Sequence, residues 1–180
     1  MVVRVAIDAM GGDHAPGEIV RGAVAAVSAN RNLKVLLVGR EEQLEQCLDD
    51  LNCSRERIDL VPAKDVILND EDPALAVRNK PGASMVTALQ LVRSGQADAA
   101  LSAGNTGALM TAGVLCLGRL TGVSRPALLA VLPGFGGEPV VVLDVGANMD
   151  ARPEQMLQYA FMGSIYAGRL LGRSNPKVAL

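Results

Sequence analysis

Short apolar runs alternate with amphipathic stretches along the first two thirds of the chain. The apolar runs have the length and composition of buried strands, and the stretches between them carry apolar residues at helical spacing. The predicted strands are residues 3–8, 33–39, 58–62 and 97–101. The predicted helices are residues 16–30, 41–51, 83–94 and 106–120. Alternation of strand and helix predicts an α/β fold with a mostly parallel sheet and right-handed crossovers.

The pattern is less regular in three other places. Residues 65–80 are polar and predict a long loop or a short helix, and long loops in compact domains are often functional. Two further strands are predicted at 127–132 and 140–145, joined by a glycine-rich connector that suits either a hairpin or a crossover. The end of the chain predicts one more helix and one more strand. These are residues 153–171 and 177–180.

Length and composition narrow the classes of protein. With 180 residues, 49% of them hydrophobic, the chain is expected to form a single domain over 1–180. Its 17 basic and 19 acidic residues are mixed along the sequence and give no basic face for nucleic acid. No apolar run approaches the roughly 18 residues of a membrane-spanning helix. The 3 cysteines do not cluster as metal ligands do, so we predict no metal site and a reducing, cytoplasmic location.

The segment Ser-Ala-Gly-Asn-Thr-Gly-Ala at 102–108 lies between a predicted strand and a predicted helix. Such a junction leaves backbone N–H groups unpaired, and glycine lets a ligand come close to them. In one interpretation, the amides of Gly104, Asn105 and Thr106 bind phosphate or an oxyanion, aided by the hydroxyls of Ser102 and Thr106. In the other, Asn105 or Thr106 simply caps the helix. No Gly-Lys-Ser/Thr follows, which argues against a loop for a nucleotide triphosphate.

The segment after the first predicted strand, Asp-Ala-Met-Gly-Gly-Asp-His, has the same form. Gly11 and Gly12 allow the backbone to turn closely over a ligand. The carboxylates of Asp8 and Asp13 are candidates to orient hydrogen-bond donors. His14, the only histidine, is a candidate for proton transfer near neutral pH. The alternative has Asp13 capping the next helix and His14 exposed in a loop.

A third strand end, Asp-Val-Gly-Ala-Asn at 144–148, combines a carboxylate with an amide. Asp144 is interpreted as a residue that fixes a neighbouring loop rather than as a metal ligand. Three such strand ends indicate one shared cleft.

Charged residues outside these segments are weaker candidates. The acidic run at 70–72 lacks the alternating spacing of a calcium loop and is interpreted as a solvated loop. Each basic residue near the glycine-rich segments is more often a solvated surface charge than a ligand contact. The candidate cations for an anionic ligand are Arg78, Lys80, Arg119 and Arg125.

Four segments together closely resemble the PlsX family of bacterial phosphate acyltransferases. They begin at Asp8, Lys80, Ser102 and Asp144, and the second reads Lys-Pro-Gly-Ala-Ser-Met. The resemblance implies a three-layer α/β/α fold like that of phosphotransacetylases and isopropylmalate dehydrogenases, usually dimeric. Family members continue well beyond residue 180, so the chain is expected to be an amino-terminal fragment that is inactive if the cleft needs both halves.

The family moves an acyl group from acyl-acyl carrier protein to inorganic phosphate, which supplies acyl phosphate for glycerol 3-phosphate acylation. Phosphate is itself the nucleophile and the thiol leaving group has a pKa of about 8.5, so no covalent nucleophile, metal or cofactor is required. The resemblance implies catalytic roles for His14, Asn105 and Lys80, the last as a contact to phosphate or to the carrier protein. It places Asp8, Gly11, Gly12, Asp13, Ser102, Gly104, Thr106, Asp144 and Asn148 around the cleft.

The implied partners are acyl-acyl carrier protein, inorganic phosphate, a second copy of the chain and a downstream membrane glycerol 3-phosphate acyltransferase. The implied location is cytoplasmic, peripheral to the inner face of the membrane. Two alternatives stay open: another enzyme on the same scaffold, phosphotransacetylase-like or a nicotinamide-dependent decarboxylating dehydrogenase, and a non-catalytic module that docks to an acyl carrier or a membrane.

Overall fold

The chain, expected from its sequence to form a single domain, divides by its internal contacts into two compact units, Met1–Gly118 and Arg119–Leu180. The computed structural model describes residues 1–146, 148 and 150–180. Ala147, which belongs to the segment at 144–148, and Met149 therefore lie outside the described residues. Gly118, with a φ of 81°, ends the last helix of the first unit in a conformation that favours glycine.

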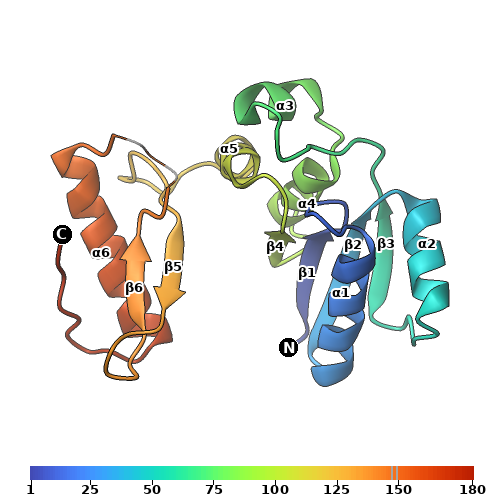
Figure 1. Ribbon diagram of the computed structural model, residues 1–180, viewed down its shortest axis with the longest axis horizontal. Coiled ribbons are helices and arrows are strands. Elements are labelled where there is room, and N and C mark those ends of the chain that lie inside the picture. The colour runs from blue at the N-terminus through green and yellow to red at the C-terminus, as the bar shows by residue number, and fades with distance from the viewer. Residues whose placement is uncertain (147, 149) are drawn as a thin grey trace. The chain divides into compact units, whose positions relative to one another are not determined.

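The first unit is built on a sheet of four parallel strands (Figure 1). In chain order these are β1 (Val3–Asp8), β2 (Leu33–Gly39), β3 (Ile58–Pro62) and β4 (Ala99–Ser102). Their order across the sheet is β3-β2-β1-β4. The helices are α1 (Gly17–Ala29), α2 (Glu41–Asp50), α3 (Pro73–Asn79), α4 (Ser84–Arg93) and α5 (Thr106–Leu117).

Successive residues of a strand face opposite sides of the sheet. In β2 the residues on both sides are apolar, so helices cover both faces of the sheet. Val35 and Leu37 of β2 belong to the core beneath α1 and α2. Leu36 and Val38 point the other way and join the core that contains residues of α4. Helix α5 packs against α4, and α3 packs against α5. The predicted fold class, helices on both faces of a mostly parallel sheet, is confirmed.

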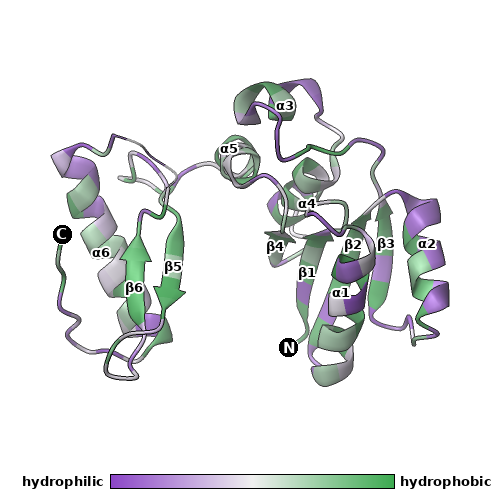
Figure 2. Cartoon of the chain, viewed as in Figure 1, coloured by the Kyte–Doolittle hydropathy of each residue, from purple (hydrophilic) through white to green (hydrophobic). Residues whose placement is uncertain are grey.

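The second unit is an antiparallel hairpin with one helix against it. Strands β5 (Leu129–Leu132) and β6 (Val140–Leu143) stand out in Figure 2 as a strongly apolar pair, and α6 (Pro153–Leu170) packs on β6. Of the two predicted connections, the hairpin is the one found. No helix in the described ranges is long and apolar enough to cross a membrane.

Two sequence predictions for element bounds are wrong. The helix predicted at 106–120 stops at Leu117, because Gly118 leaves the helical conformation. The strand predicted at 177–180 does not form, since a strand needs a neighbour to bond its backbone groups and the sheet of this unit consists of β5 and β6.

Candidate functional site

Two of the three glycine-rich strand ends meet in the first unit because β1 and β4 are neighbours. The register of these strands puts Asp8 directly opposite Ser102. The Ser102 hydroxyl donates to Asp8 Oδ2 at 2.7 Å, and the Gly104 N–H donates to the Ser102 oxygen at 3.1 Å. Asp8 Oδ1 also accepts the Met10 N–H at 3.2 Å. The carboxylate is 2% exposed, so these bonds replace the water that its oxygens lose on burial.

Gly11 and Gly104 allow the segments that follow β1 and β4 to lie in close contact. A Cβ atom on Gly11 would lie 2.5 Å from Asp8 Oδ2, 2.9 Å from the Gly104 nitrogen and 2.9 Å from the Ser102 hydroxyl oxygen. A Cβ atom on Gly104 would lie 3.2 Å from the Gly11 Cα and 3.3 Å from Met85 Cε. A side chain at either glycine would therefore collide with the backbone of the other segment. Met85, from the segment that begins at Lys80, also contacts this place.

Asn105 is both the N-cap of α5 and a clamp on the segment before α3. Its Oδ1 accepts the Ala108 N–H at 2.9 Å, the contact expected of a helix cap. Its amide nitrogen donates to the carbonyls of Leu68, Asn69 and Glu71 at 3.2, 3.3 and 3.1 Å. Asn105 is 8% exposed, and its side chain is already engaged at both ends. Its catalytic role stays a prediction, and the geometry describes a positioning residue.

The same segment, residues 66–72, is tied down at two further points; we call it the tethered loop. Lys80 Nζ pairs with the Glu71 carboxylate and donates to the Val66 carbonyl at 2.8 Å. Asn69 donates to Asp13 Oδ1 at 3.2 Å. The hydrogen bond from Lys80 lowers the pKa of Glu71 below its usual 4.5, against the opposing effect of burial. The role of Lys80 in binding a substrate also stays a prediction.

Other predicted site residues of the first unit are exposed or half-buried. Asp13, His14 and Thr106 are exposed, and Gly12 is half-buried with a φ of 112°. Helix α1 has Pro16 as its N-cap and no side-chain capping bond, so the alternative in which Asp13 caps this helix is wrong. The buried groups of the site therefore fix the backbone, and the exposed ones are accessible to a ligand.

The third strand end lies in the second unit and is joined to the segment before β5. Asp144 Oδ1 accepts the Leu128 N–H at 3.1 Å, and Asp144 Oδ2 accepts from the Asn148 amide at 2.6 Å. The same amide nitrogen lies 3.1 Å from the Tyr159 hydroxyl. Burial, followed by the negative charge of Asp144, raises the pKa of Tyr159 above its usual 10. These are contacts of a carboxylate that fixes a loop, and the single cleft shared by all three strand ends stays a prediction.

The acidic run at 70–72 contains positioning residues that the sequence analysis interpreted as a solvated loop. Glu71 pairs with Lys80, and Asp72 accepts the Leu75 N–H at 2.9 Å as the N-cap of α3. The sequence held a signal for the second role, because an aspartate before a proline matches an N-cap followed by the first residue of a helix. Among the described residues, no group of His, Cys, Asp and Glu side chains is arranged to hold a metal ion.

Comparison with known proteins identifies relatives over nearly the whole chain. The sequence model of a family described as fatty acid synthesis protein matches residues 3–180. A phosphate acyltransferase of Heliobacterium modesticaldum is 51% identical over 179 residues, which are 99% of this chain and 53% of that protein. A phosphate acyltransferase of Brevibacillus brevis is 50% identical, with coverages of 99% and 52%. The chain thus spans about half the length of these relatives.

Solved structures with the same fold include two phosphotransacetylases. The EutD phosphotransacetylase from Staphylococcus aureus superposes with a TM-score of 0.65 at 18% identity, covering 92% of this chain and 53% of the other. A phosphotransacetylase from Streptococcus pyogenes superposes with a TM-score of 0.66 at 15% identity, with coverages of 88% and 51%. At this level of identity the likeness supports the fold.

The close contact between the segments that follow β1 and β4 predicts opposite effects on stability for two Gly→Ala changes. Gly11→Ala is expected to lower the free energy of unfolding by about 1–3 kcal/mol, because its Cβ meets backbone and the bonded carboxylate. Gly22→Ala, inside α1 with nothing within 4 Å of its Cβ, should raise it by about 0.5–1 kcal/mol. Urea denaturation of both variants measures this difference. Equal stability of Gly11→Ala and the parent chain would contradict the close contact at Gly11.

Substitution of Asn105 separates its two contacts. Asn105→Ser keeps a capping oxygen but removes the amide, and Asn105→Ala removes both. Hydrogen exchange of the tethered loop should accelerate in both variants, whereas Asn105→Ala should lose about 0.5–2 kcal/mol more unfolding free energy than Asn105→Ser. Asn79→Ala, at the exposed end of α3, is the matched control and should leave the exchange unchanged. Unchanged exchange in Asn105→Ser would rule out the clamp.

The ion pair of Lys80 and Glu71 predicts how the tethered loop responds to acid. Because the pKa of Glu71 in the folded chain is lowered, its stabilising contribution is present above the unfolded value and is lost as the pH falls through the folded value. The carbon-13 NMR titration of Glu71 should have a midpoint below 4.5 that rises in Lys80→Met. In Lys34→Met, which breaks the separate pair with Asp59, the midpoint should not move. A midpoint insensitive to Lys80→Met would refute the pair.

Proposed function

Because the chain belongs to the fatty acid synthesis protein family, we propose that it provides part of an enzyme that moves a fatty acyl group from acyl-acyl carrier protein to inorganic phosphate. Relatives that share 50–51% of their aligned residues with this chain are named phosphate acyltransferases. The product is an acyl phosphate, a mixed anhydride that a later enzyme consumes by acylating an alcohol, here glycerol 3-phosphate. The substrates, the homodimer and the contact with a downstream membrane acyltransferase belong to this proposal.

The observation that supports the proposal best is the division between buried and exposed groups at the β1–β4 edge. Asp8 and Ser102 are used within the protein, where they fix the two strand ends. This leaves His14 and the Thr106 hydroxyl exposed beyond the ends of those strands. Ligands of open α/β sheets bind outside the carboxyl ends of the strands, so these groups are the ones we assign to the substrate.

Such a site suits a reaction whose reactants already carry the reactive groups. An oxygen of phosphate attacks the thioester carbon, the C–S bond breaks, and the thiolate that leaves takes up a proton. In this proposal the Thr106 hydroxyl donates to phosphate, and His14 supplies the proton to the leaving sulfur. Fixed backbone holds these groups in one geometry, which lowers the entropic cost of bringing phosphate to the thioester.

Acyl phosphate can be trapped as a hydroxamate, which gives a direct test. We expect a chimera in which this chain replaces the matching half of the Heliobacterium modesticaldum relative to form hydroxamate from long-chain acyl-acyl carrier protein only when inorganic phosphate is present. Acyl-coenzyme A in place of the carrier protein tests the identity of the donor. A folded chimera that yields no phosphate-dependent product, beside an active relative, would overturn the proposal.

In the same chimera, Thr106→Val is expected to raise the KM for phosphate by about tenfold, the loss of one hydrogen bond to a charged group. Thr106→Ser keeps the hydroxyl and serves as the matched control, with a KM close to that of the unsubstituted chimera. An unchanged KM in Thr106→Val would remove this residue from the phosphate site.

A further inference from the structure

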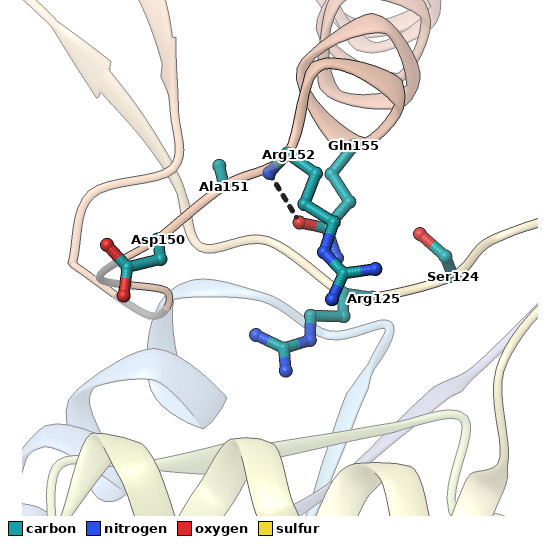
Figure 3. Close-up of a pocket in the computed structure, with 6 residues that line it drawn as sticks. All are labelled: Ser124, Arg125, Asp150, Ala151, Arg152 and Gln155. Atoms are coloured by element: carbon teal, nitrogen blue, oxygen red, sulfur yellow. Dashed lines mark hydrogen bonds between the residues drawn. The ribbon is translucent and has the colours of Figure 1, made fainter.

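A pocket with two arginines lies in the second unit, at the start of α6 (Figure 3). Arg125 extends into it from the segment before β5, and Arg152, the N-cap residue of α6, lines the same pocket. The lining residues are Ser124, Arg125, Asp150, Ala151, Arg152 and Gln155. The two guanidinium groups bring several N–H donors and two positive charges to one pocket.

Arg125 is held by the network that joins the third strand end to the rest of its unit. Its guanidinium lies 3.4 Å from Asn148 Oδ1. The Asn148 amide in turn donates to Asp144 at 2.6 Å and to the Pro126 carbonyl at 3.2 Å. Tyr159, at the far side of this amide, is only 6% exposed. Within the described residues, the network therefore orients Arg125 through one long contact to Asn148, and the other N–H groups of its guanidinium show no partner there.

The backbone of Arg152 is pinned while its side chain stays exposed. Its N–H donates to Gln155 Oε1 at 2.8 Å, and the Gln155 N–H donates back to the Arg152 carbonyl at 2.9 Å. These bonds occupy the N–H groups of Arg152 and Gln155, while the Arg152 guanidinium lines the pocket. Asp150 lines the same pocket, but Figure 3 shows it set apart from both arginines, and in the described part of the chain it forms no ion pair with either.

Ser124 fixes the wall of the pocket. Both its N–H and its hydroxyl donate to Gln158 Oε1, at 3.0 and 2.8 Å, and Arg119 donates to its carbonyl. The Ser124 hydroxyl is thus committed within the protein, and a third guanidinium lies next to the pocket wall.

The charge of the second unit favours an anion in this pocket. Residues 119–180 contain six arginines and lysines and four aspartates and glutamates, a formal charge of +2 in a chain whose total is -2. A positive local field raises the concentration of anions at the surface and adds to the pairwise attraction of the arginines.

We propose that Arg125 and Arg152 bind a phosphoryl group, either free inorganic phosphate or the phosphate monoester end of a larger molecule. Near neutral pH such a group carries a charge close to the combined charge of the two arginines, and its three terminal oxygens accept from both forks. A carboxylate has one charge and two oxygens and is the poorer match. The site does not rest on the reaction proposed above, because binding is measured without turnover.

Calorimetric titration of the 180-residue chain with inorganic phosphate, methyl phosphate and acetate at low ionic strength tests the site. Arg125→Gln and Arg152→Gln should each weaken phosphoryl binding by about tenfold, the loss of a charge-assisted contact. Arg169→Gln removes the same charge from the exposed last turn of α6 and should leave binding unchanged. Circular dichroism checks folding. Arg152 forms no side-chain hydrogen bond or ion pair with the other described residues, so Arg152→Gln keeps the test valid if Arg125→Gln misfolds.

The titrations also distinguish the source of the phosphoryl group. Binding of inorganic phosphate that both pocket variants weaken supports a site for free phosphate. Binding of methyl phosphate alone, weakened in the same way, supports a site for an esterified phosphate. The proposal is overturned if acetate binds as tightly as phosphate, if neither phosphate binds, or if the pocket variants and Arg169→Gln behave alike.

Discussion

The hydrogen bond between Asp8 and Ser102 is the contact on which the first unit's candidate site depends. It joins the carboxyl ends of two neighbouring strands whose register already places the two residues opposite each other. An unpaired carboxylate at 2% exposure would be strongly destabilising, so the chain must keep a donor at this point. Gly11 and Gly104 let the donor and acceptor approach by removing the side chains that would separate the two backbones.

Asn105 extends the same constraint to a part of the chain that lies far away in sequence. Its two ends bond the first turn of α5 and the tethered loop, which Lys80 and Asp13 hold at other points. Residues that resemble catalytic groups by their type therefore act here on the backbone. A reaction that depends on positioning needs such rigidity, since a loop free to move would lose the alignment of its exposed groups.

In the second unit, too, some polar side chains bond within the protein and a neighbouring one is exposed. The Asp144 carboxylate and the Asn148 amide bond each other and the segment before β5, and the group presented outward is the Arg125 guanidinium. In both units a hydrogen-bonded carboxylate and its donor, buried or half-buried, fix a strand end, and other polar groups near them are exposed. The two exposed sets differ in character, because the first offers a hydroxyl and an imidazole and the second offers cations.

The order of strands and helices and the strand-end segments followed from the sequence by itself, because apolar periodicity and glycine placement are local properties. The sequence also marked Asp8, Ser102, Asn105 and Asp144 as polar groups at those ends. Their hydrogen-bond partners and the degree to which each is buried were decided by tertiary structure. Asn105 meets carbonyls 34 to 37 residues away, and no local pattern encodes such a contact. For the same reason the segment at 177–180, apolar enough for a strand, is not one: a strand exists only where another strand bonds its backbone.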